Sequence, residues 1–392
     1  MDVSPINRCR GCHADPGRLH EVLRLDPMPL AGAFCRTAAE ALAAPLLPLT
    51  WMECAACGLV QVLEDVPDSL LFSTYNYASS TVPGLVRHFE DYAGLLGRHH
   101  GADPLTVLEI GCNDGVLLRR LPASWRRIGV DPSDVAFEAA RGADYELIHR
   151  PFSTEAVEAA GLAGKVDVIS GSNCLAHVSD LRAIFLAAAV ALRVGGEFWI
   201  EVHDLDALLE GAQWDTIYHE HKAEWSEAAL GSCVSACGFQ WRETTRIPMH
   251  GGAIRVRFQR VSGPTPAPSC PGPQRGLDRL RRAYANRHGV PTVRRLLELQ
   301  SQGQTIAAYG AAGRAKVYLA QIPELEFAYI VDESPLRIGR FIPRSATPIV
   351  PPGQLVAQPP AACLVTAWNY RDDIIRKTTQ WKGEWLTAFP AE

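Results

Sequence analysis

The sequence predicts an α/β protein in which two parallel-sheet units follow a small cysteine-rich subdomain. From residue 106 to about residue 260, short β-branched and apolar runs alternate with stretches rich in alanine and leucine. That alternation is typical of a parallel sheet whose strands are joined by crossover helices. Residues 262–273 are rich in proline, which neither helix nor sheet tolerates, so we place a domain boundary there. A second, smaller strand–turn–helix pattern follows.

Each expected strand is a short apolar run bounded by turn residues. The central unit has these runs at residues 106–110, 127–130, 166–170, 197–202, 239–245 and 253–260. In the second unit, helices are expected at 277–287, 291–302 and 314–320, and strands at 305–309, 327–331 and 361–366. The first 95 residues show many prolines and little helical periodicity. The expected domains are 1–75, 76–261 and 274–392.

The charge balance limits the classes of partner. The 392 residues include 38 basic and 43 acidic side chains, for a formal net charge of −5. Nucleic-acid-binding modules usually carry a basic excess, so we expect no nucleic-acid partner. No apolar run approaches the ~20 residues that cross a bilayer, and the N-terminus lacks the features of a signal peptide. We therefore expect a cytoplasmic protein with no membrane partner, acting as a monomer or a homodimer.

Two pairs of cysteines have the spacing of metal ligands. Cys9 and Cys12 form one CxxC pair, and Cys54 and Cys57 form a second pair, with 41 residues between the two pairs. Each pair directs two thiolates at one ion, and two pairs complete the tetrahedral S4 site that Zn²⁺ prefers. Four thiolates leave no open position, so a structural zinc is expected. The alternative is four buried or incidental cysteines; Cys35, in the gap, is not an expected ligand.

A glycine-containing turn follows the first strand of the central unit. Glu109 ends that strand, Gly111 and Gly115 allow close approach of a ligand to the backbone, and Asp131 ends the second strand. An NAD site would normally show G-x-G-x-x-G, whereas here three residues separate the glycines. Glu-x-Gly-x3-Gly followed by this aspartate resembles the S-adenosylmethionine site of class I methyltransferases. The alternative is an ordinary turn between a strand and a helix.

Polar residues also follow the strand expected at residues 166–170. Open α/β sheets bind ligands at the carboxyl ends of their strands, so Asn173 and His177 are expected to face cofactor or substrate. Taken alone, His177 would more often be a capping or core histidine, and its place after this strand makes the two interpretations about equal.

Residues 213–221 contain many ionisable side chains and follow the strand expected at residues 197–202. The segment contains Tyr218, His219, Glu220 and His221, with Trp and Ile between polar positions. The two histidines are two residues apart and do not share a helix face, which argues against a metal pair. A histidine beside a carboxylate is suited to acid–base chemistry at neutral pH. The alternative is a buried polar network that holds the domain together.

The run Asp215-Thr-Ile-Tyr-His-Glu-His221 resembles the signature of the sugar C-methyltransferases that branch deoxysugars during antibiotic biosynthesis. The resemblance covers nearly the whole chain, including the paired CxxC motifs. Its other motifs are Tyr75-Asn-Tyr-Ala-Ser-Ser80, Leu108-Glu-Ile-Gly-Cys-Asn-Asp-Gly115, Val130-Asp-Pro-Ser133, His250-Gly-Gly-x-x-Arg255, Ala308-Tyr-Gly-Ala311, Asp332-x-x-Pro335 with Gly339, and Trp368-Asn369.

This resemblance implies a zinc-binding domain, a class I methyltransferase domain with a Rossmann-like fold, and a smaller Rossmann-like domain that contacts a nucleotide sugar. It implies that a nucleotide-linked 4-keto-deoxysugar, expected to carry thymidine diphosphate, loses a proton next to its ketone. The enolate then attacks the methyl group of S-adenosylmethionine. The expected cofactor contacts are Glu109, Gly111, Asn113, Asp114, Gly115, Asp131 and Asn173.

Roles in catalysis follow from position in the motif. His221 is the expected base and Glu220 the residue that orients or charges it. Tyr218 and Tyr77 are expected hydroxyl donors or relays, and His177 is placed to hydrogen-bond the ketone or the sugar. The expected substrate contacts are Tyr75, Asn173, His250, Arg255, Tyr309 and Arg314.

Several positions depart from the family pattern. His203, directly after the strand expected at residues 197–202, stands where the family usually has proline. Ala253 stands where serine is common, and Pro343-Arg344 replaces Pro-Gly. The segment Gly310-Ala-Ala-Gly-Arg-Ala315 also differs. These departures concern the acceptor more than methyl transfer. A non-sugar ketone, RNA, or a non-catalytic nucleotide-sugar-binding role therefore stay open as alternatives, with RNA disfavoured by the acidic balance.

Overall fold

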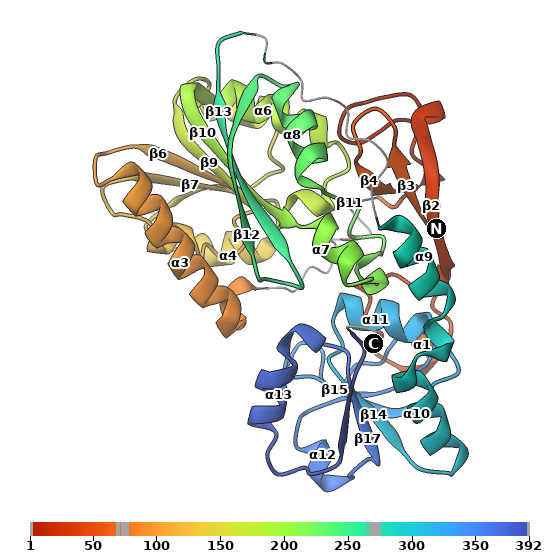
Figure 1. Cartoon of the computed structure of the whole chain (residues 1–392). Coiled ribbons are helices and arrows are strands. Elements are labelled where there is room, and N and C mark those ends of the chain that lie inside the picture. The colour runs from red at the N-terminus through yellow and green to blue at the C-terminus, as the bar shows by residue number, and fades with distance from the viewer. Residues whose placement is uncertain (1–2, 68–70, 72–77, 264, 266–275, 390–392) are drawn as a thin grey trace.

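The computed structural model describes residues 3–67, 71, 78–263, 265 and 276–389. An N-terminal sheet lies beside a large central sheet, and a C-terminal sheet lies below both (Figure 1). The expected site residues Tyr75 and Tyr77, and most of the proline-rich segment, lie outside the described residues.

The central sheet has seven strands in the order β12-β13-β10-β9-β6-β7-β8. β13 runs antiparallel to both of its neighbours, so the other strands all point the same way. This is the Rossmann-like arrangement expected from the sequence, in which β6, the first strand of the sheet in chain order, lies inside the sheet between β9 and β7. The strands span β6 (Thr106–Ile110), β7 (Arg126–Val130), β8 (Glu146–Ile148), β9 (Val166–Ser172), β10 (Leu192–His203), β12 (Phe239–Ile247) and β13 (Ala253–Arg260).

Alternation along the central strands builds a core on each face of the sheet. Leu108, Ile169 and Phe198 belong to one apolar cluster, whereas their neighbours Val107 and Val168 belong to another. Successive side chains of a strand point to opposite faces, so both faces are apolar and both must be covered. The covering helices are α3 (Pro83–His100), α4 (Asp134–Ala140), α5 (Thr154–Ala159), α6 (Leu181–Ala191) and α8 (Glu227–Ser235). Helix α7 (Leu205–Glu210) instead buries its leucines in a separate apolar cluster with residues of the C-terminal domain.

Helix α3 corrects the sequence analysis. The first 95 residues were expected to show little helical periodicity, yet α3 has 18 residues and begins at Pro83. Its buried residues Leu85, Phe89, Tyr92 and Leu96 recur three or four residues apart, which is one face of a helix. The charged and glycine residues between them obscured this pattern in a cysteine-rich and proline-rich region.

The N-terminal sheet has the order β11-β4-β3-β2. β2 (Leu19–Met28), β3 (Leu47–Cys54) and β4 (Val60–Val62) come from the first domain, but β11 (Ala223–Glu224) comes from the chain just past His221. Ala223 pairs with Gln61. The cysteine-rich domain therefore holds the backbone of the expected catalytic segment. The remaining elements there are β1 (Ser4–Pro5), β5 (Glu64–Asp65), the short helix α1 (Ala38–Leu42), and the 3-10 turns η1 (Pro16–Arg18) and η2 (Ser79–Thr81).

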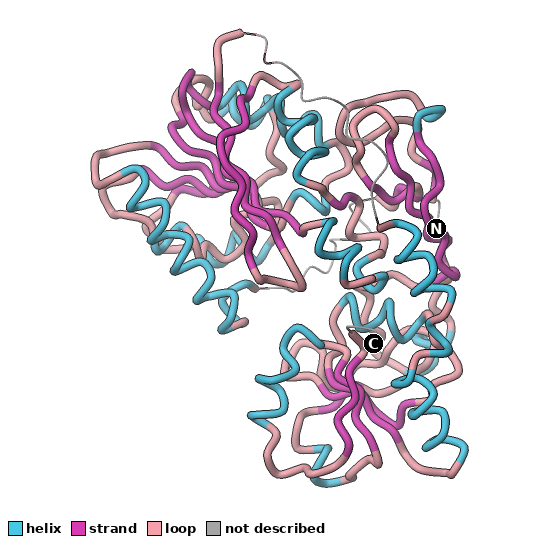
Figure 2. Tube along the Cα trace, viewed as in Figure 1, coloured by secondary structure: helices cyan, strands magenta, loops and turns pink. Residues whose placement is uncertain are grey.

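The C-terminal sheet is fully parallel, in the order β16-β15-β14-β17-β18 (Figure 2). Its expected strands are found at β14 (Ile306–Tyr309), β15 (Phe327–Val331) and β17 (Ala362–Val365), and the edge strands β16 (Ile349–Val350) and β18 (Glu384–Thr387) were not expected. The helices are α9 (Leu277–Ala285), α10 (Pro291–Ser301), α11 (Gly313–Ala320), α12 (Gln354–Ala357) and α13 (Arg371–Lys377). No helix in the described part of the chain is long and apolar enough to cross a membrane.

Candidate active site

The turn after β6 is shaped by glycine and by one aspartate. Gly111 has a φ of +66°, and a Cβ there would lie 2.7 Å from Cβ of Cys174, in the loop after β9. Asp131, at the end of β7, accepts hydrogen bonds from the backbone N–H of Asn113 (2.9 Å) and of Ser133 (2.8 Å). The carboxyl ends of three neighbouring strands therefore converge on one closely packed loop cluster.

This loop cluster holds buried polar atoms that no described residue satisfies. They are Oε2 of Glu109, Oδ1 of Asp114 and Oδ1 of Asn173. Burial, with the charges of Asp131 and Asp114, raises the pKa of Glu109 well above its usual value. Leaving such groups without partners is costly, so the geometry calls for a ligand that brings positive charge and hydrogen-bond donors.

The described end of the tyrosine-containing motif reaches the same loop. The backbone N–H of Ser79 donates to Oδ1 of Asn113 (2.9 Å), and that of Ser80 donates to Oδ2 of Asp114 (3.0 Å). The side chains of Asn113 and Asp114 therefore hold this segment against the turn after β6.

Four histidines gather at the carboxyl edge of the central sheet. His177 follows β9, His203 ends β10, His221 follows the 3-10 turn η5 (Trp214–Thr216), and His250 lies between β12 and β13. The ring centroid of His221 lies 5.3 Å from that of His177 and 5.0 Å from that of His203. The rings of His203 and His250 are 6.0 Å apart. The sequence predicted three of these positions and treated His203 only as a departure from a family pattern.

His221 has the tautomer and the partner of a proton acceptor. Its Nδ1–H donates to the backbone oxygen of Thr216 (3.1 Å), which leaves Nε2 to accept from the hydroxyl of Tyr218 at 2.5 Å. Burial lowers the pKa of His221 to about 3, an effect that Glu224 partly opposes. The ring is therefore neutral at pH 7 and able to accept a proton.

The structure gives His221 a different carboxylate from the one expected. Oε1 of Glu220 accepts from the backbone N–H of Gly32 at 2.5 Å, which turns Glu220 toward the N-terminal domain. Glu224 instead lies beside His221, with Oε1 3.5 Å from Nδ1 of the ring. Burial alone raises the pKa of Glu224, but His203 and His221 outweigh it and lower the pKa to about 2. The structure therefore places Glu224, and not the expected Glu220, beside Nδ1 of His221.

The rest of the 213–221 segment ties the three domains together. Nε2 of His219 donates to the backbone oxygen of Pro48 (2.9 Å) in the N-terminal domain. Asp215 accepts two hydrogen bonds from the guanidinium of Arg314 (2.7 and 3.1 Å) and one from Nε1 of Trp368 (3.0 Å). Part of this segment therefore forms the buried polar network that the sequence analysis gave as the alternative. Tyr218 lies against His221, whose ring is next to those of His177 and His203.

Three of the expected substrate contacts already have partners within the chain. Arg255 donates twice to Oε2 of Glu201 (2.8 and 3.0 Å) and its guanidinium lies over the ring of Tyr92. Arg314 is held by Asp215, and the hydroxyl of Tyr309 donates to Glu333 (3.1 Å). These contacts favour a role in holding the domains over a direct role in binding an acceptor.

The four cysteines lie together as predicted. Sγ of Cys9 is 3.6 Å from Sγ of Cys57, and Sγ of Cys12 is 3.7 Å from Sγ of Cys54. A tetrahedral zinc with ~2.3 Å Zn–S bonds places its sulfurs about 3.8 Å apart, so the donor set fits the ion. Cys35 lies outside this group of ligand atoms, as expected.

Comparison with known families identifies all three parts. A model described as a zinc binding domain matches residues 9–72, a methyltransferase domain matches residues 85–244, and a C-methyltransferase C-terminal domain matches residues 281–390. The chain is 28% identical to the C-methyltransferase NovU of Streptomyces niveus over 389 residues, which cover 95% of this chain and 92% of the relative. The protein is an S-adenosylmethionine-dependent methyltransferase.

Other similarities are confined to part of this methyltransferase. A ubiquinone biosynthesis O-methyltransferase of Methylobacterium sp. (strain 4-46) is 33% identical over 115 residues, which cover 26% of this chain and 45% of the relative. The solved 1,6-didemethyltoxoflavin-N1-methyltransferase of Burkholderia thailandensis is 16% identical with a TM-score of 0.38, covering 52% of this chain and 96% of that chain.

The loop cluster after β6, β7 and β9 fits S-adenosylmethionine, the cofactor of this methyltransferase. The cofactor brings a sulfonium, an ammonium group and ribose hydroxyls, which match the clustered carboxylates of Glu109, Asp114 and Asp131 and the free amide oxygen of Asn173. It supplies a methyl group activated by the positive sulfur. The zinc ion binds the four-cysteine cluster in the N-terminal domain.

Replacing Gly111 with Ala is expected to weaken cofactor binding about tenfold, or ~1.4 kcal/mol, because the new methyl group forces the loop carrying Cys174 away from the turn. Titration with S-adenosylhomocysteine measures this. Gly164→Ala is the matched control: it has the same φ of +66° but nothing within 4 Å of the new Cβ. It carries the ~1–2 kcal/mol of backbone strain without the collision. Equal affinity in the two variants would contradict the prediction.

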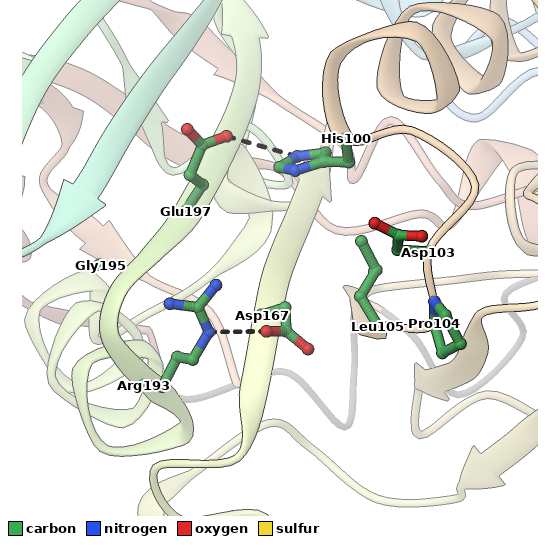
Figure 3. A pocket seen from close by; sticks show the side chains of 8 residues that line it. All are labelled: His100, Asp103, Pro104, Leu105, Asp167, Arg193, Gly195 and Glu197. Atoms are coloured by element: carbon green, nitrogen blue, oxygen red, sulfur yellow. Dashed lines mark hydrogen bonds and ion pairs between the residues drawn. The ribbon is translucent and has the colours of Figure 1, made fainter.

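A separate hollow of about 350 Å³ lies at the opposite, amino edge of the central strands (Figure 3). His100 contacts Glu197 there, and Arg193 contacts Asp167. Glu197 is also held by Arg257 at 2.9 Å and by Nε1 of Trp199 at 3.0 Å. The charges of Glu197, Arg193 and Asp167 are thus balanced by one another or by neighbouring side chains. We assign this hollow no part in the reaction.

Proposed function

We propose that this methyltransferase removes a proton from the carbon next to the ketone of a nucleotide-linked 4-keto-deoxysugar and methylates the resulting enolate. The observation that supports it most is the 2.5 Å contact between the hydroxyl of Tyr218 and Nε2 of the neutral His221. A carbon acid next to a ketone is weak, so it requires a placed base and donors to the developing oxyanion. Tyr218 passes the proton to His221, which lies beside His177, whose Nδ1–H donates to the backbone oxygen of Glu220 (2.6 Å).

The C-terminal domain offers space for the nucleotide. A cavity of about 770 Å³ lies among α10, α13 and β18, lined in part by Trp368, Tyr370, Trp385 and Arg371. Aromatic rings suit stacking on a base, and a guanidinium suits a diphosphate. Trp368 joins this cavity to the active site, because its Nε1 donates to Asp215 in the catalytic segment. In this proposal, Asn173 and His250 contact the sugar.

The proposal is tested by mixing the protein with S-adenosylmethionine and a thymidine-diphospho-4-keto-deoxysugar in deuterated water and recording the sugar by mass spectrometry. We expect a singly methylated nucleotide sugar. Without the methyl donor, we expect deuterium exchange next to the ketone faster than in an enzyme-free control. If neither change occurs while S-adenosylhomocysteine still binds, the acceptor is not this sugar, and small non-sugar ketones become the next candidates.

A further inference from the structure

Glu224 is a buried carboxylate that two histidines share. Its exposed fraction is 1%, and neither carboxylate oxygen has a hydrogen-bond partner among the described residues. Oε1 lies 3.5 Å from Nδ1 of His221 and 3.6 Å from Nδ1 of His203. A buried charge requires a counter-charge, so one of these rings must balance it.

The geometry assigns that counter-charge to His203. Nδ1 of His221 already donates to the backbone oxygen of Thr216, and its Nε2 accepts from Tyr218, which is the neutral form of the ring. Nδ1 of His203 is buried and faces Glu224, with no other described partner. Among the described residues, two other titratable groups lie near this ring: His250, 6.0 Å away on the turn between β12 and β13, and His177, whose pKa is lowered in part by the charge of His203.

The outer nitrogen of His203 is open to the site. The side chain of His203 is 15% exposed. Nε2 is not among the buried atoms without a partner, and no described residue bonds to it, so it is the exposed edge of the ring. A carboxylate that holds the inner nitrogen of an imidazole while its outer nitrogen faces the reactants is a recurrent acid–base unit.

A metal ion is the competing explanation for these three side chains. Ligand atoms of His203, His221 and Glu224 lie within 4.8 Å of one another. However, the nitrogen of His221 that faces Glu224 carries a proton and donates it to Thr216, so it has no lone pair for a metal. The geometry therefore favours proton chemistry.

We propose that His203 is a further catalytic residue of this methyltransferase, and that Glu224 is the positioning residue that keeps it protonated. This rests on the proposed function.

When the C–H bond next to the ketone breaks, its proton passes through Tyr218 to Nε2 of His221. The bonding pair forms the C=C bond of the enolate, and the carbonyl π pair moves to oxygen, which accepts a hydrogen bond from Nε2–H of His203. In this proposal, the carboxylate of Glu224 lies beside both the neutral base His221 and the cationic hydrogen-bond donor His203.

The charge pairing is tested without any acceptor. Nuclear magnetic resonance of isotope-labelled histidine reports which ring nitrogens carry protons, and His203→Gln assigns the signal. At neutral pH we expect both nitrogens of His203 protonated in the wild type, and one of them deprotonated in Glu224→Gln. The control is His99→Gln, which removes a ring beside Glu197, a carboxylate that Arg257 already balances. A His203 signal unchanged by Glu224→Gln would overturn the pairing.

The catalytic role is tested with the thymidine-diphospho-4-keto-deoxysugar. We expect His203→Gln to lower kcat on the order of 100-fold, the usual effect of losing one oxyanion donor, with S-adenosylhomocysteine affinity and melting temperature retained. His99→Gln should retain kcat. Wild-type kcat in His203→Gln would overturn the role of His203. If the wild type itself leaves this sugar unchanged, the proposed function fails while the resonance experiment still decides the pairing.

Metal analysis separates the two explanations. We expect one zinc per chain, held by the cysteines, in the wild type and in Glu224→Gln alike. A second metal ion in the wild type that is lost in Glu224→Gln and His203→Gln would overturn the proposal and make the three side chains ligands. His203 is partly exposed, so its variant keeps the proposal testable if Glu224→Gln does not fold.

Discussion

Replacing His221 with Asn is expected to lower turnover about 1,000-fold, within the range for loss of a general base, while cofactor binding is retained. Asn can still donate to Thr216 but cannot take a proton from Tyr218. Glu109 lies on β6 and Asp131 directly follows β7, apart from η5 and the segment after it, so affinity for S-adenosylhomocysteine should be unchanged. Steady-state kinetics and calorimetric titration measure the two quantities.

The control for this prediction is His288→Asn, which changes a histidine of the C-terminal domain that contacts Glu324 far along the chain from the active site. We expect it to retain wild-type turnover. Tyr218→Phe removes the relay hydroxyl but keeps the ring that lies 3.9 Å from the His221 ring, so it should fall between the wild type and His221→Asn. Wild-type turnover in His221→Asn would show that another group accepts the proton.

Removing zinc is expected to abolish turnover although the ion lies outside the reacting atoms. Structural zinc sites contribute directly to folding, at about 10–16 kcal/mol in small zinc domains. β11 is a strand of the N-terminal sheet, and Ala223 and Glu224 pair with Gln61 and Val60 next to the cysteines. Loss of that sheet would release Glu224 and His221, whereas the cofactor loop belongs to the central sheet. Treatment with a chelator should therefore eliminate methyl transfer before cofactor binding.

Two cysteine variants make this prediction specific. Cys54→Ser removes one of the four ligands and should lose both zinc and turnover, as measured by elemental analysis and methyl transfer. Cys35→Ser changes a cysteine outside the cluster and should keep both. Hydrogen exchange should show β4 and β11 opening together in the chelated protein. Full turnover in zinc-free protein would contradict the prediction that the zinc-bound N-terminal sheet holds Glu224 and His221 in place.

Elements defined by neighbouring residues could be predicted from the sequence. The strand ending in Glu109, the turn at Gly111 and the strand ending in Asp131 each depend on a few consecutive residues, and all are found where expected. The CxxC pairs likewise carry their own geometry, since each turn directs two thiolates to one point. The same local reasoning failed for α3, because its apolar face is spread over 18 residues.

The sequence by itself predicted a methyl-donor loop, a four-thiolate zinc site and a histidine base, because each depends on short-range spacing. The tertiary structure alone decided which carboxylate lies beside the expected base. Glu220 is adjacent to His221 in the chain, but its carboxylate bonds to Gly32, far away in sequence. Glu224 reaches His221 because β11 joins a sheet built by residues more than 160 positions earlier, and His203 meets both because β10 ends at the same edge. Contacts of that kind are set by strand pairing between domains, which no local pattern records.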